Sequence, residues 1–466
     1  MYSEFLSLCG FEPEEIKREA PRIDKTFSIL EIGPDDVNRA KGRIEDFFDI
    51  ELLGMRKVLG LWLKELTDMV LAKEEGKKVV YVSFPPISQI GAAIALASED
   101  VYCAAPDVVL SNTLNLLFGK INPILETAEK HGLAPGIAFC SYLQTRLGAI
   151  VKGIVPMPDL LIPSCFLCDL TPATDGLLHE VYGIPVAYID NLLDVRGEQW
   201  PEVISPRKVQ YFGSEMRNAI EKFSQVTGCQ LPESKIRQAV DVGNRLNSAS
   251  DQIQQLRQAD PLPLSQNDYQ LVSVLASACI KRGLQEGVEA LSILRGEVEK
   301  RVNDGIGVAE KGAPRVLLVM VPHDGALAAM IGGLGLAICV TAGASTPGGS
   351  RPSSYTSLWE NVADLQMRRR GANYSSLAYI LQLKELARLW NVDGIIFFRH
   401  YSCRQYSIFP IKAKEVIEKE LGIPVLLLEG DYCDFRSYNA QQMRTRVETF
   451  AEIVKADKAA RKGNRS

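Results

Sequence analysis

The chain has 466 residues and a formal net charge of −5, with 46% hydrophobic and 23% charged residues. At roughly 100–200 residues per domain, this length predicts two to four domains with sizeable buried cores. The slightly acidic balance, without a basic stripe, argues against a nucleic-acid partner.

Apolar residues recur at helical spacing through residues 1–75, as in RIEDFFDIELLGMRKVLGLWLKELTDMVL, and predict an N-terminal helical region. The first residues, MYSEFLSLCGFEPEEIKRE, contain acids where a signal peptide needs a basic start and a long apolar core. We therefore expect a cytoplasmic protein whose thiols stay reduced.

Short apolar runs alternate with helical patterns from residue 76 to 205. Strands that alternate with helices predict an α/β lobe with a doubly wound parallel sheet. The expected strands are VVYVSF (79–84), EDVYCAA (99–105), APGIAFCS (134–141), PDLLIPSC (158–165) and IPVAYID (184–190).

The pattern changes to amphipathic helices over residues 206–312, with a break at PLPLS (261–265), and predicts a helical module. Strand patterns return over residues 313–466 and predict a second α/β lobe that ends in a helix. The expected strands there lie in RVLLVMVP, LGLAICVTAG, VDGIIFFRHYSC and GIPVLLLEGDYC.

The segment ALAAMIGGLGLAICVTAGAS (326–345) has no charge over about 20 residues, the length of a membrane span. Its glycines and its β-branched end predict instead a buried helix, a glycine turn and a buried strand. We therefore expect no membrane association.

The two α/β regions share a weak internal repeat. PDLLIPSCFLCD with HEVYGIPVAYID is similar to VDGIIFFRHYSCRQY with EKELGIPVLLLEGD. Each unit is a predicted strand, a cysteine at its end, a helix, the turn GIP and another strand. The repeat predicts two related lobes that each present cysteine at the same place.

Six of the ten cysteines fall at the predicted carboxyl ends of strands, which is the edge where open α/β sheets bind ligands. They are Cys103, Cys140, Cys165, Cys168, Cys403 and Cys433. A structural zinc site typically uses two close cysteine pairs, and this chain has one CxxC. Thiolates spread over positions 103–433 favour an iron–sulfur cluster held between two lobes.

Cysteines also occur in proteins for reasons unrelated to metal. A single cysteine is often a small buried hydrophobe, and we expect this for Cys9, Cys229, Cys279 and Cys339, which fall away from the strand ends. A CxxC pair is also the motif of thioredoxin-like redox sites, although Phe166 and Leu167 are unusual between such cysteines. The set of six together favours a metal.

Polar residues crowd the same predicted edge, in RHYSCRQY (399–406) and EGDYCDFRSY (429–438). We select His400 and Arg404 as candidate catalytic residues, because a histidine near a cluster is suited to donate a proton. The alternative is that Arg399, Arg404 and Arg436 pair with the acids and hold the loops together. His323, in VPHDG, also falls at a predicted strand end.

Nucleotide-binding motifs are missing from the chain. It has no GxxxxGK[ST] loop, and IGGLGLA (331–337) lacks the strand–turn–helix order of a dinucleotide fingerprint. An ATP-dependent reaction would therefore need a second protein.

Five stretches resemble the 2-hydroxyacyl-CoA dehydratase and benzoyl-CoA reductase superfamily: AFCSYLQTRLGAI, PMPDLLIPSCFLCD, GIPVAYID, VDGIIFFRHYSCRQYS and GIPVLLLEGDYCDFRSYNAQQMRTRVETFAE. The resemblance covers about residues 78–205 and 313–455. It implies two flavodoxin-like lobes with three cysteines that hold one [4Fe–4S] cluster, which Cys140, one of Cys165 and Cys168, and Cys403 match. It also implies an activator, an ATP-hydrolysing iron–sulfur dimer that delivers low-potential electrons.

This chain departs from the three-cysteine pattern by adding Cys103, Cys433 and the second member of the CxxC pair. It is most similar to the double-cubane cluster proteins, in which two cubanes share a sulfide as [8Fe–9S]. That branch implies an oxygen-sensitive homodimer that takes electrons from an ATP-dependent reductase and reduces a small molecule. The departure argues against acyl-CoA dehydration, because a filled double cluster leaves less room for a thioester oxygen at an open iron.

Two alternatives stay open. The first is that the chain is a dehydratase or aryl-CoA reductase subunit with one [4Fe–4S] cluster. The second is that it is a non-catalytic electron-transfer subunit. The first predicts about four iron per chain and a paralogous partner. The second predicts no ATP-dependent turnover with any activator.

Overall fold

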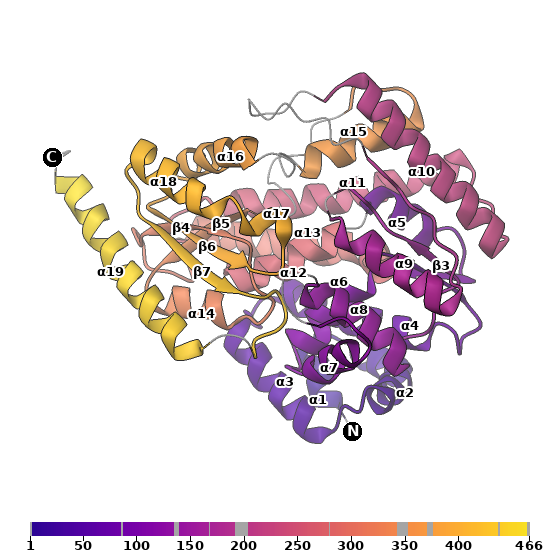
Figure 1. Cartoon of the computed structure of the whole chain (residues 1–466). Helices are drawn as coiled ribbons and strands as arrows, with labels where there is room; N and C mark the ends of the chain where they lie inside the picture. The colour runs from indigo at the N-terminus through magenta and orange to yellow at the C-terminus, as the bar shows by residue number, and fades with distance from the viewer. Residues whose placement is uncertain are drawn as a thin grey trace.

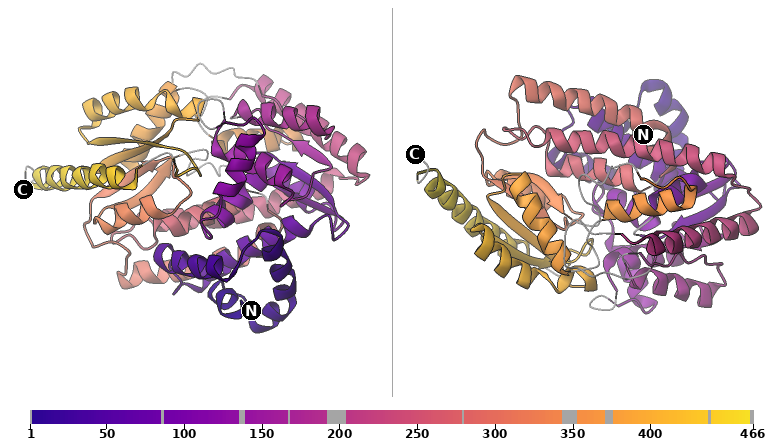
Figure 2. Two further views of the ribbon diagram at one scale, coloured as in Figure 1. Left: turned by 60° about the horizontal axis from the view of Figure 1, so that its bottom comes forward. Right: turned by 90° about the horizontal axis from the view of Figure 1, so that it is seen from above.

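The computed structural model describes residues 2–84, 87–134, 139–166, 168–191, 204–278, 280–342, 353–370, 376–436 and 439–463. The described chain is an α/β protein with two parallel sheets that lie apart from each other, beside long helices (Figures 1 and 2).

The N-terminal region is helical, as predicted. It contains α1 (Ser3–Leu8), α2 (Pro13–Ile29), α3 (Pro34–Phe47) and α4 (Leu53–Leu71). Most residues of α4 are buried, on every side of the helix, so this helix is covered all round.

The first sheet has the strand order β2-β1-β3, with β1 (Lys78–Val82), β2 (Val101–Ala104) and β3 (Leu160–Ile162) all parallel. The helices of this lobe are α5 (Ser88–Ala95), α6 (Pro106–Leu110), the π-helix η1 (Ser111–Asn115), α7 (Asn122–Lys130), α8 (Ser141–Lys152) and α9 (Leu170–Tyr182). The expected strand 184–190 contributes only isolated bridges, Leu161 with Val186 and Ser164 with Ile189. Half of the expected strand 134–141, residues 135–138, lies outside the described residues.

The helical module consists of α10 (Pro206–Thr227), α11 (Glu233–Leu256), α12 (Gln266–Ser277) and α13 (Lys281–Asp304), with the predicted break between α11 and α12. Helix α13 packs tightly against α4. A Cβ atom at Gly54 would lie 2.4 Å from the backbone nitrogen of Leu294, so only glycine permits this approach.

The second sheet has the order β5-β4-β6-β7 and is also parallel. Its strands are β4 (Arg315–Val319), β5 (Ala337–Ala342), β6 (Gly394–His400) and β7 (Val425–Gly430). Around it lie α14 (Ala326–Gly333), α16 (Ser376–Leu389), α17 (Arg404–Ser407), α18 (Pro410–Leu421) and α19 (Ala440–Gly463). The segment 326–345 therefore contains the predicted helix and strand, with Gly335 at a φ of 78° in the turn.

Helix α15 (Leu358–Arg370) follows the second lobe's β5 in sequence but packs beside α10, near the first lobe (Figure 1). The backbone of Trp359 lies 3.0 Å from the position of a Cβ at Gly213. The chain thus crosses between the lobes after β5 and returns before β6, which ties the two lobes together.

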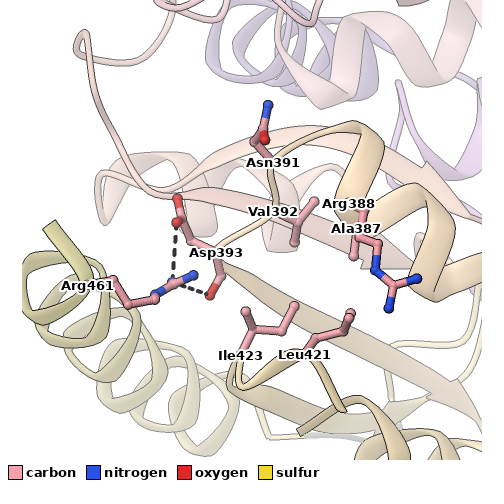
Figure 3. Close-up of a pocket in the computed structure, with 8 residues that line it drawn as sticks. All are labelled: Ala387, Arg388, Asn391, Val392, Asp393, Leu421, Ile423 and Arg461. Carbon is pink, nitrogen blue, oxygen red and sulfur yellow. Dashed lines mark hydrogen bonds and ion pairs between the residues drawn. The ribbon is translucent and has the colours of Figure 1, made fainter. Parts of the chain in front are cut away.

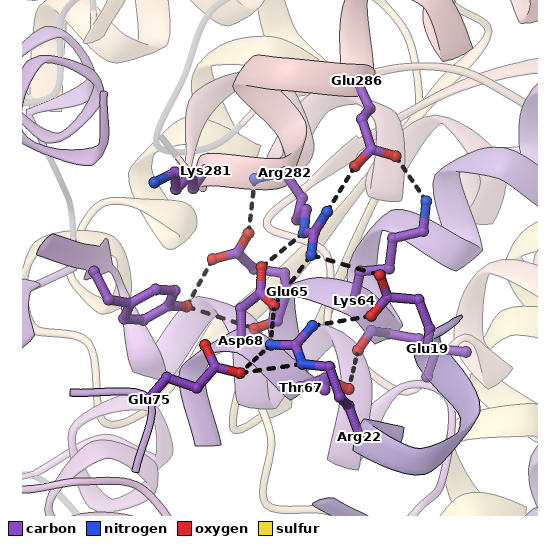
Figure 4. A network of polar contacts seen from close by, with 12 residues as sticks. Glu19, Arg22, Lys64, Glu65, Thr67, Asp68, Glu75, Lys281, Arg282 and Glu286 are labelled. Carbon is purple, nitrogen blue, oxygen red and sulfur yellow. Dashed lines mark hydrogen bonds and ion pairs between the residues drawn. The ribbon is translucent and has the colours of Figure 1, made fainter. Parts of the chain in front are cut away.

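A polar network fastens the N-terminal helices to the module (Figure 4). Asp68 of α4 pairs with Arg22 of α2 at 2.9 Å and with Arg282 of α13 at 2.7 Å. Glu65, also on α4, accepts hydrogen bonds from the Tyr102 hydroxyl at 2.6 Å and from the Arg282 backbone N–H at 3.0 Å. Tyr102 belongs to β2, so the network also holds a strand of the first sheet.

Among the helices in the described part of the chain, none has both the length and the apolar character needed to cross a membrane.

Candidate metal centre

The carboxyl edges of the two sheets meet. Cys140 precedes α8 of the first lobe, and Cys433 follows β7 of the second lobe. The Cys433 backbone N–H donates a hydrogen bond to Ser141 Oγ at 2.8 Å, so these two cysteine-bearing loops are in direct contact. Cys403 is the N-cap residue of α17 and reaches the same region.

Four of the six predicted cysteines lie close enough to influence one another. Burial raises the pKa of the Cys140 thiol well above its usual range, and the charges of Asp431, Cys168 and Cys403 raise that pKa further. Burial also raises the pKa of Cys433, with added contributions from Asp431 and Cys140. The centre therefore gathers thiols from both lobes around one carboxylate.

Cys165 lies among acidic side chains. Burial raises the pKa of Cys165 to about 11, with contributions from Asp190, Glu215 and Asp175 and a smaller one from Cys168. Cys168 therefore lies near both Cys165 and Cys140.

Cys103 lies inside β2, opposite Val80 of β1, and its side chain is fully buried in the core of the first lobe. Of the cysteines expected to be small hydrophobes, Cys9 and Cys339 are fully buried and Cys229 is half-buried. Cys339 lies in β5, where its thiol donates to the Val316 carbonyl at 3.6 Å. Cys279 lies outside the described residues.

Asp431 is the buried carboxylate at the middle of the centre, with 3% of its surface exposed. Its Oδ1 accepts hydrogen bonds from the hydroxyl and backbone N–H of Ser141 and from the Tyr432 backbone N–H. Its Oδ2 accepts from the Ser402 hydroxyl at 2.5 Å. Burial raises the pKa of Asp431, and these hydrogen bonds oppose that rise.

An aromatic stack adjoins the centre. The His400 ring lies parallel to Tyr432 with 4.1 Å between the ring centroids, and Phe398 meets it edge-on at 5.0 Å. His400 is 1% exposed, and neither of its ring nitrogens has a hydrogen-bond partner in the described structure. Burial, and next the charge of His323, lower the pKa of His400 well below its usual range, so the imidazole is neutral at pH 7.

His323 belongs to the same stack. Its Nε2 lies 3.0 Å from the Tyr142 hydroxyl, and its backbone N–H donates to the Tyr432 carbonyl at 2.9 Å. Burial lowers the pKa of His323 to about 3. Both histidines are therefore neutral imidazoles at the lobe boundary.

The arginines near the centre mostly pair with acids. Arg399 pairs with Glu429 at 2.5 Å, and Arg436 pairs with Asp434 at 2.9 Å and with Glu129 at 2.5 Å. For these two, the predicted alternative of loop-holding ion pairs is confirmed. The side chain of Arg404 lies outside the described part of the structure.

A fully buried cation supports the cysteine loops of the first lobe. Arg146 of α8 pairs with Asp107 of α6 at 2.9 Å and with Asp175 of α9 at 2.6 Å. Each of these helices begins shortly after one of the predicted cysteine ligands. Burial raises the pKa of Asp175 to about 6 despite the arginine.

Sequence reasoning missed three polar residues at the centre. Ser141 and Ser402 are directly adjacent to Cys140 and Cys403, and this repeated Ser–Cys adjacency was a usable signal. Asn115 forms a side-chain hydrogen bond with Cys433 and donates to the His323 carbonyl at 2.7 Å. It belongs to a π-helix, a feature that occurs frequently at functional sites but has no sequence period of its own.

Thiols on separate loops are the kind of donor that an iron–sulfur cluster takes. Within the described ranges, no group of three or more His, Cys, Asp or Glu side chains is placed to hold one metal ion. An iron–sulfur cluster is larger and takes thiolates from separate loops. Four thiols from both lobes, set in buried surroundings, fit that kind of group.

The pocket in Figure 3 lies away from the centre. It has a volume of about 360 Å³ and is lined by Arg388, Asp393, Arg461 and mostly apolar neighbours. Asp393 directly precedes β6, whereas His400 ends it, and a seven-residue strand is about 20 Å long. The pocket is therefore at the amino edge of the sheet, opposite the edge where α/β sheets bind ligands.

Fold and site together define an α/β protein of two parallel-sheet lobes with a cysteine-rich centre between them. Residues 97–454 match the family model of the 2-hydroxyglutaryl-CoA dehydratase D-component, and the chain belongs to this family.

Several characterised enzyme subunits are similar to the chain. The (R)-phenyllactyl-CoA dehydratase alpha subunit of Clostridium sporogenes is 22% identical over 402 residues, which cover 84% of this chain and 92% of that subunit. The alpha subunit of (R)-2-hydroxyglutaryl-CoA dehydratase from Acidaminococcus fermentans is 25% identical over 306 residues, covering 65% of this chain and 62% of that subunit. The B subunit of benzoyl-CoA reductase from Thauera aromatica is 21% identical over 349 residues, covering 70% of this chain and 78% of that protein.

Proposed function

We propose that the chain is an iron–sulfur reductase component that carries a double-cubane [8Fe–9S] cluster at the boundary between its lobes. The observation that supports this most is that Cys140 lies near Cys168, Cys403 and Cys433, with Asp431 beside Cys140 and Cys433 and with loops contributed by both lobes. Family membership and the reductase and dehydratase names of its relatives support a redox-active enzyme of this type.

The six proposed ligands are Cys103, Cys140, Cys165, Cys168, Cys403 and Cys433. When bound, the cluster would supply low-potential electrons to a small-molecule substrate. Cys165 lies three positions before Cys168 and is influenced by its charge, which supports its role as a ligand of a second cubane. The Cys103 side chain is buried in the core of the first lobe and would need to move toward the edge of the sheet to reach a cluster. Of the six proposed ligands, it therefore requires the largest rearrangement.

The protein's own residues would shield and orient the reacting region. His400 and His323 are buried and neutral, so we propose that they act through N–H groups and lone pairs rather than as imidazolium acids. The two unpartnered ring nitrogens of His400 make it the candidate for a hydrogen bond to a substrate, with its N–H as donor. Arg404 remains a second candidate from its position directly after Cys403.

The electrons would come from a separate ATP-hydrolysing iron–sulfur activator, because the chain has no phosphate-binding loop of its own. We propose that the working unit is a homodimer. The alpha and B designations of the relatives support an assembly of more than one subunit.

A second candidate is an acyl-CoA dehydratase subunit with one [4Fe–4S] cluster. It is favoured by the dehydratase names of the relatives and by the gathering of four of the six cysteines, with Cys103 apart in a strand. This candidate needs one open position on the cluster and a partner subunit that completes the site.

Cysteine substitutions test the ligand set. We expect Cys103→Ser and Cys433→Ser each to lower the iron content of anaerobically purified protein, because each removes a thiolate ligand. The matched control is Cys339→Ser, an equally buried cysteine of β5, which should keep full iron content. Full loading of the Cys103 variant would remove the double cubane and leave the single-cluster candidate.

A further inference from the structure

Asp431 is unusual among the acids of this edge because its described hydrogen bonds are made with hydroxyl and amide groups rather than with a cation. Glu429, at the end of β7, and Asp434, on the loop after it, pair with Arg399 and Arg436 respectively. Burying a carboxylate costs free energy unless several donors compensate it. The hydrogen bonds from these donors therefore compensate the loss of hydration of the Asp431 carboxylate.

The donors share a position in the sequence. Each one is directly adjacent to a proposed cysteine ligand: Ser141 follows Cys140, Ser402 precedes Cys403, and Tyr432 precedes Cys433. The three loops come from both lobes, and Ser141 lies 290 positions before Asp431 in the sequence. One carboxylate thus bonds to residues that are next to three proposed ligands.

The Ser141 hydroxyl extends the arrangement. It donates to Asp431 Oδ1 and accepts from the Cys433 backbone N–H at 2.8 Å, so both of its bonding functions are used. Removing the carboxylate would leave the Ser141 and Ser402 hydroxyls and two backbone N–H groups without their partner in a buried place. Each unsatisfied buried group is costly, so the three loops would separate rather than remain closed.

We propose that Asp431 is a positioning residue that fixes the loops of Cys140, Cys403 and Cys433 relative to one another, across the two lobes, before any cluster is bound. The purpose of this positioning rests on the proposed function, because it takes the three cysteines as cluster ligands. The arrangement itself does not require metal, and it can be measured on the metal-free protein.

Hydrogen–deuterium exchange on metal-free full-length protein tests the proposal. With Asp431→Ala we expect backbone exchange to speed up at least tenfold in residues 139–143, 401–405 and 431–434 together. Asp431→Asn keeps the shape and an acceptor oxygen, so it should restore slow exchange in all three loops. Acceleration confined to residues 431–434, or no acceleration, would overturn the proposal.

The matched control is Asp268→Ala. Asp268 is also a buried carboxylate held by a hydroxyl and an amide, Ser265 Oγ at 2.6 Å and the Asp49 N–H at 2.9 Å, but it lies on α12. Its loss should leave the three loops unchanged. If Asp431→Ala does not fold, Ser402→Ala must speed exchange in residues 139–143 as well as in its own loop, and a purely local effect would overturn the proposal.

Iron and reduction potential separate this proposal from the proposed function. In protein that carries a cluster, Asp431→Asn should raise the midpoint potential by removing a negative charge, whereas Ser402→Ala should leave it unchanged. A wild-type protein without iron would refute the proposed function and leave the exchange result standing. Full iron together with unchanged exchange in Asp431→Ala would refute the positioning role alone.

Discussion

Glu65 is a buried carboxyl whose protonation state depends on pH near neutrality. It is fully buried, and its bonds to the Tyr102 hydroxyl and the Arg282 N–H only partly offset the loss of hydration. Burial first, and then the charge of Asp68, raise its pKa from 4.5 to about 7. The folded protein therefore keeps a proton that the unfolded chain has already released.

This pKa shift predicts a loss of stability with rising pH. The stabilisation from a protonated Glu65 is complete below about pH 4.5 and is lost as the pH rises through about 7. It is worth on the order of 3 kcal/mol in the free energy of unfolding. We expect Glu65→Gln to remove this slope in urea denaturation at about pH 5, 6, 7 and 8. Parallel pH profiles for the two proteins would contradict the assignment, and the exposed Glu14→Gln serves as control.

Asp68 does not confuse this test, because its effect has the opposite sign. Although its burial raises the pKa, its pairs with Arg282 and Arg22 lower it below the usual 3.8. Its stabilisation is present at neutral pH and is lost only as the pH falls through that lowered pKa. The two carboxyls therefore act in separate pH ranges.

At the level of elements, the contact between α4 and α13 gives the most direct stability prediction. Gly54→Ala would place a methyl group 2.4 Å from the Leu294 nitrogen and force the helices apart. We expect a loss of about 1–3 kcal/mol in the free energy of unfolding, seen as a lower melting temperature.

Gly296 of α13, the helix that packs against α4, supplies the control. A Cβ there meets nothing within 4 Å, so Gly296→Ala should stabilise α13 by about 0.5–1 kcal/mol through its better helix propensity. Equal melting temperatures for Gly54→Ala and the wild type would mean that the two helices do not pack this closely.

Most elements were predictable because local pattern and burial agree. The strand runs are continuous and apolar since parallel strands are covered on both faces, and β1, β2, β4, β6 and β7 lie where such runs occur. Periodicity does not say which lobe covers a helix, so the crossing of α15 to α10 was not predictable. Periodicity also does not say how many ladder hydrogen bonds a segment forms. For this reason a full strand was expected at residues 184–190, where the structure has only isolated bridges.

The site was predictable where it depends on sheet topology. Strand ends of one sheet share an edge, and this rule groups Cys140 with Cys168 in the first lobe and Cys403 with Cys433 in the second. The contact between the lobes depends on the relative placement of two sheets, which no local pattern encodes. The role of Asp431 and the entry of Asn115 into the centre depend on that placement.

For the molecule as a whole, the lobes are joined by polar contacts as well as by chain crossings. Ser141 contacts Asp431 and Cys433, and Glu129 pairs with Arg436. The proposed cluster would add bonds across the same boundary. We therefore infer that cluster loading and the joining of the lobes stabilise each other.

The most direct test of this account is the amount of iron and acid-labile sulfide per chain in protein purified without oxygen. The double-cubane proposal predicts about eight iron and about nine sulfide per chain. About four of each would contradict the double cubane and select the single-cluster dehydratase candidate. Protein that folds normally but contains no iron, and takes up none on anaerobic reconstitution, would contradict the metal centre itself.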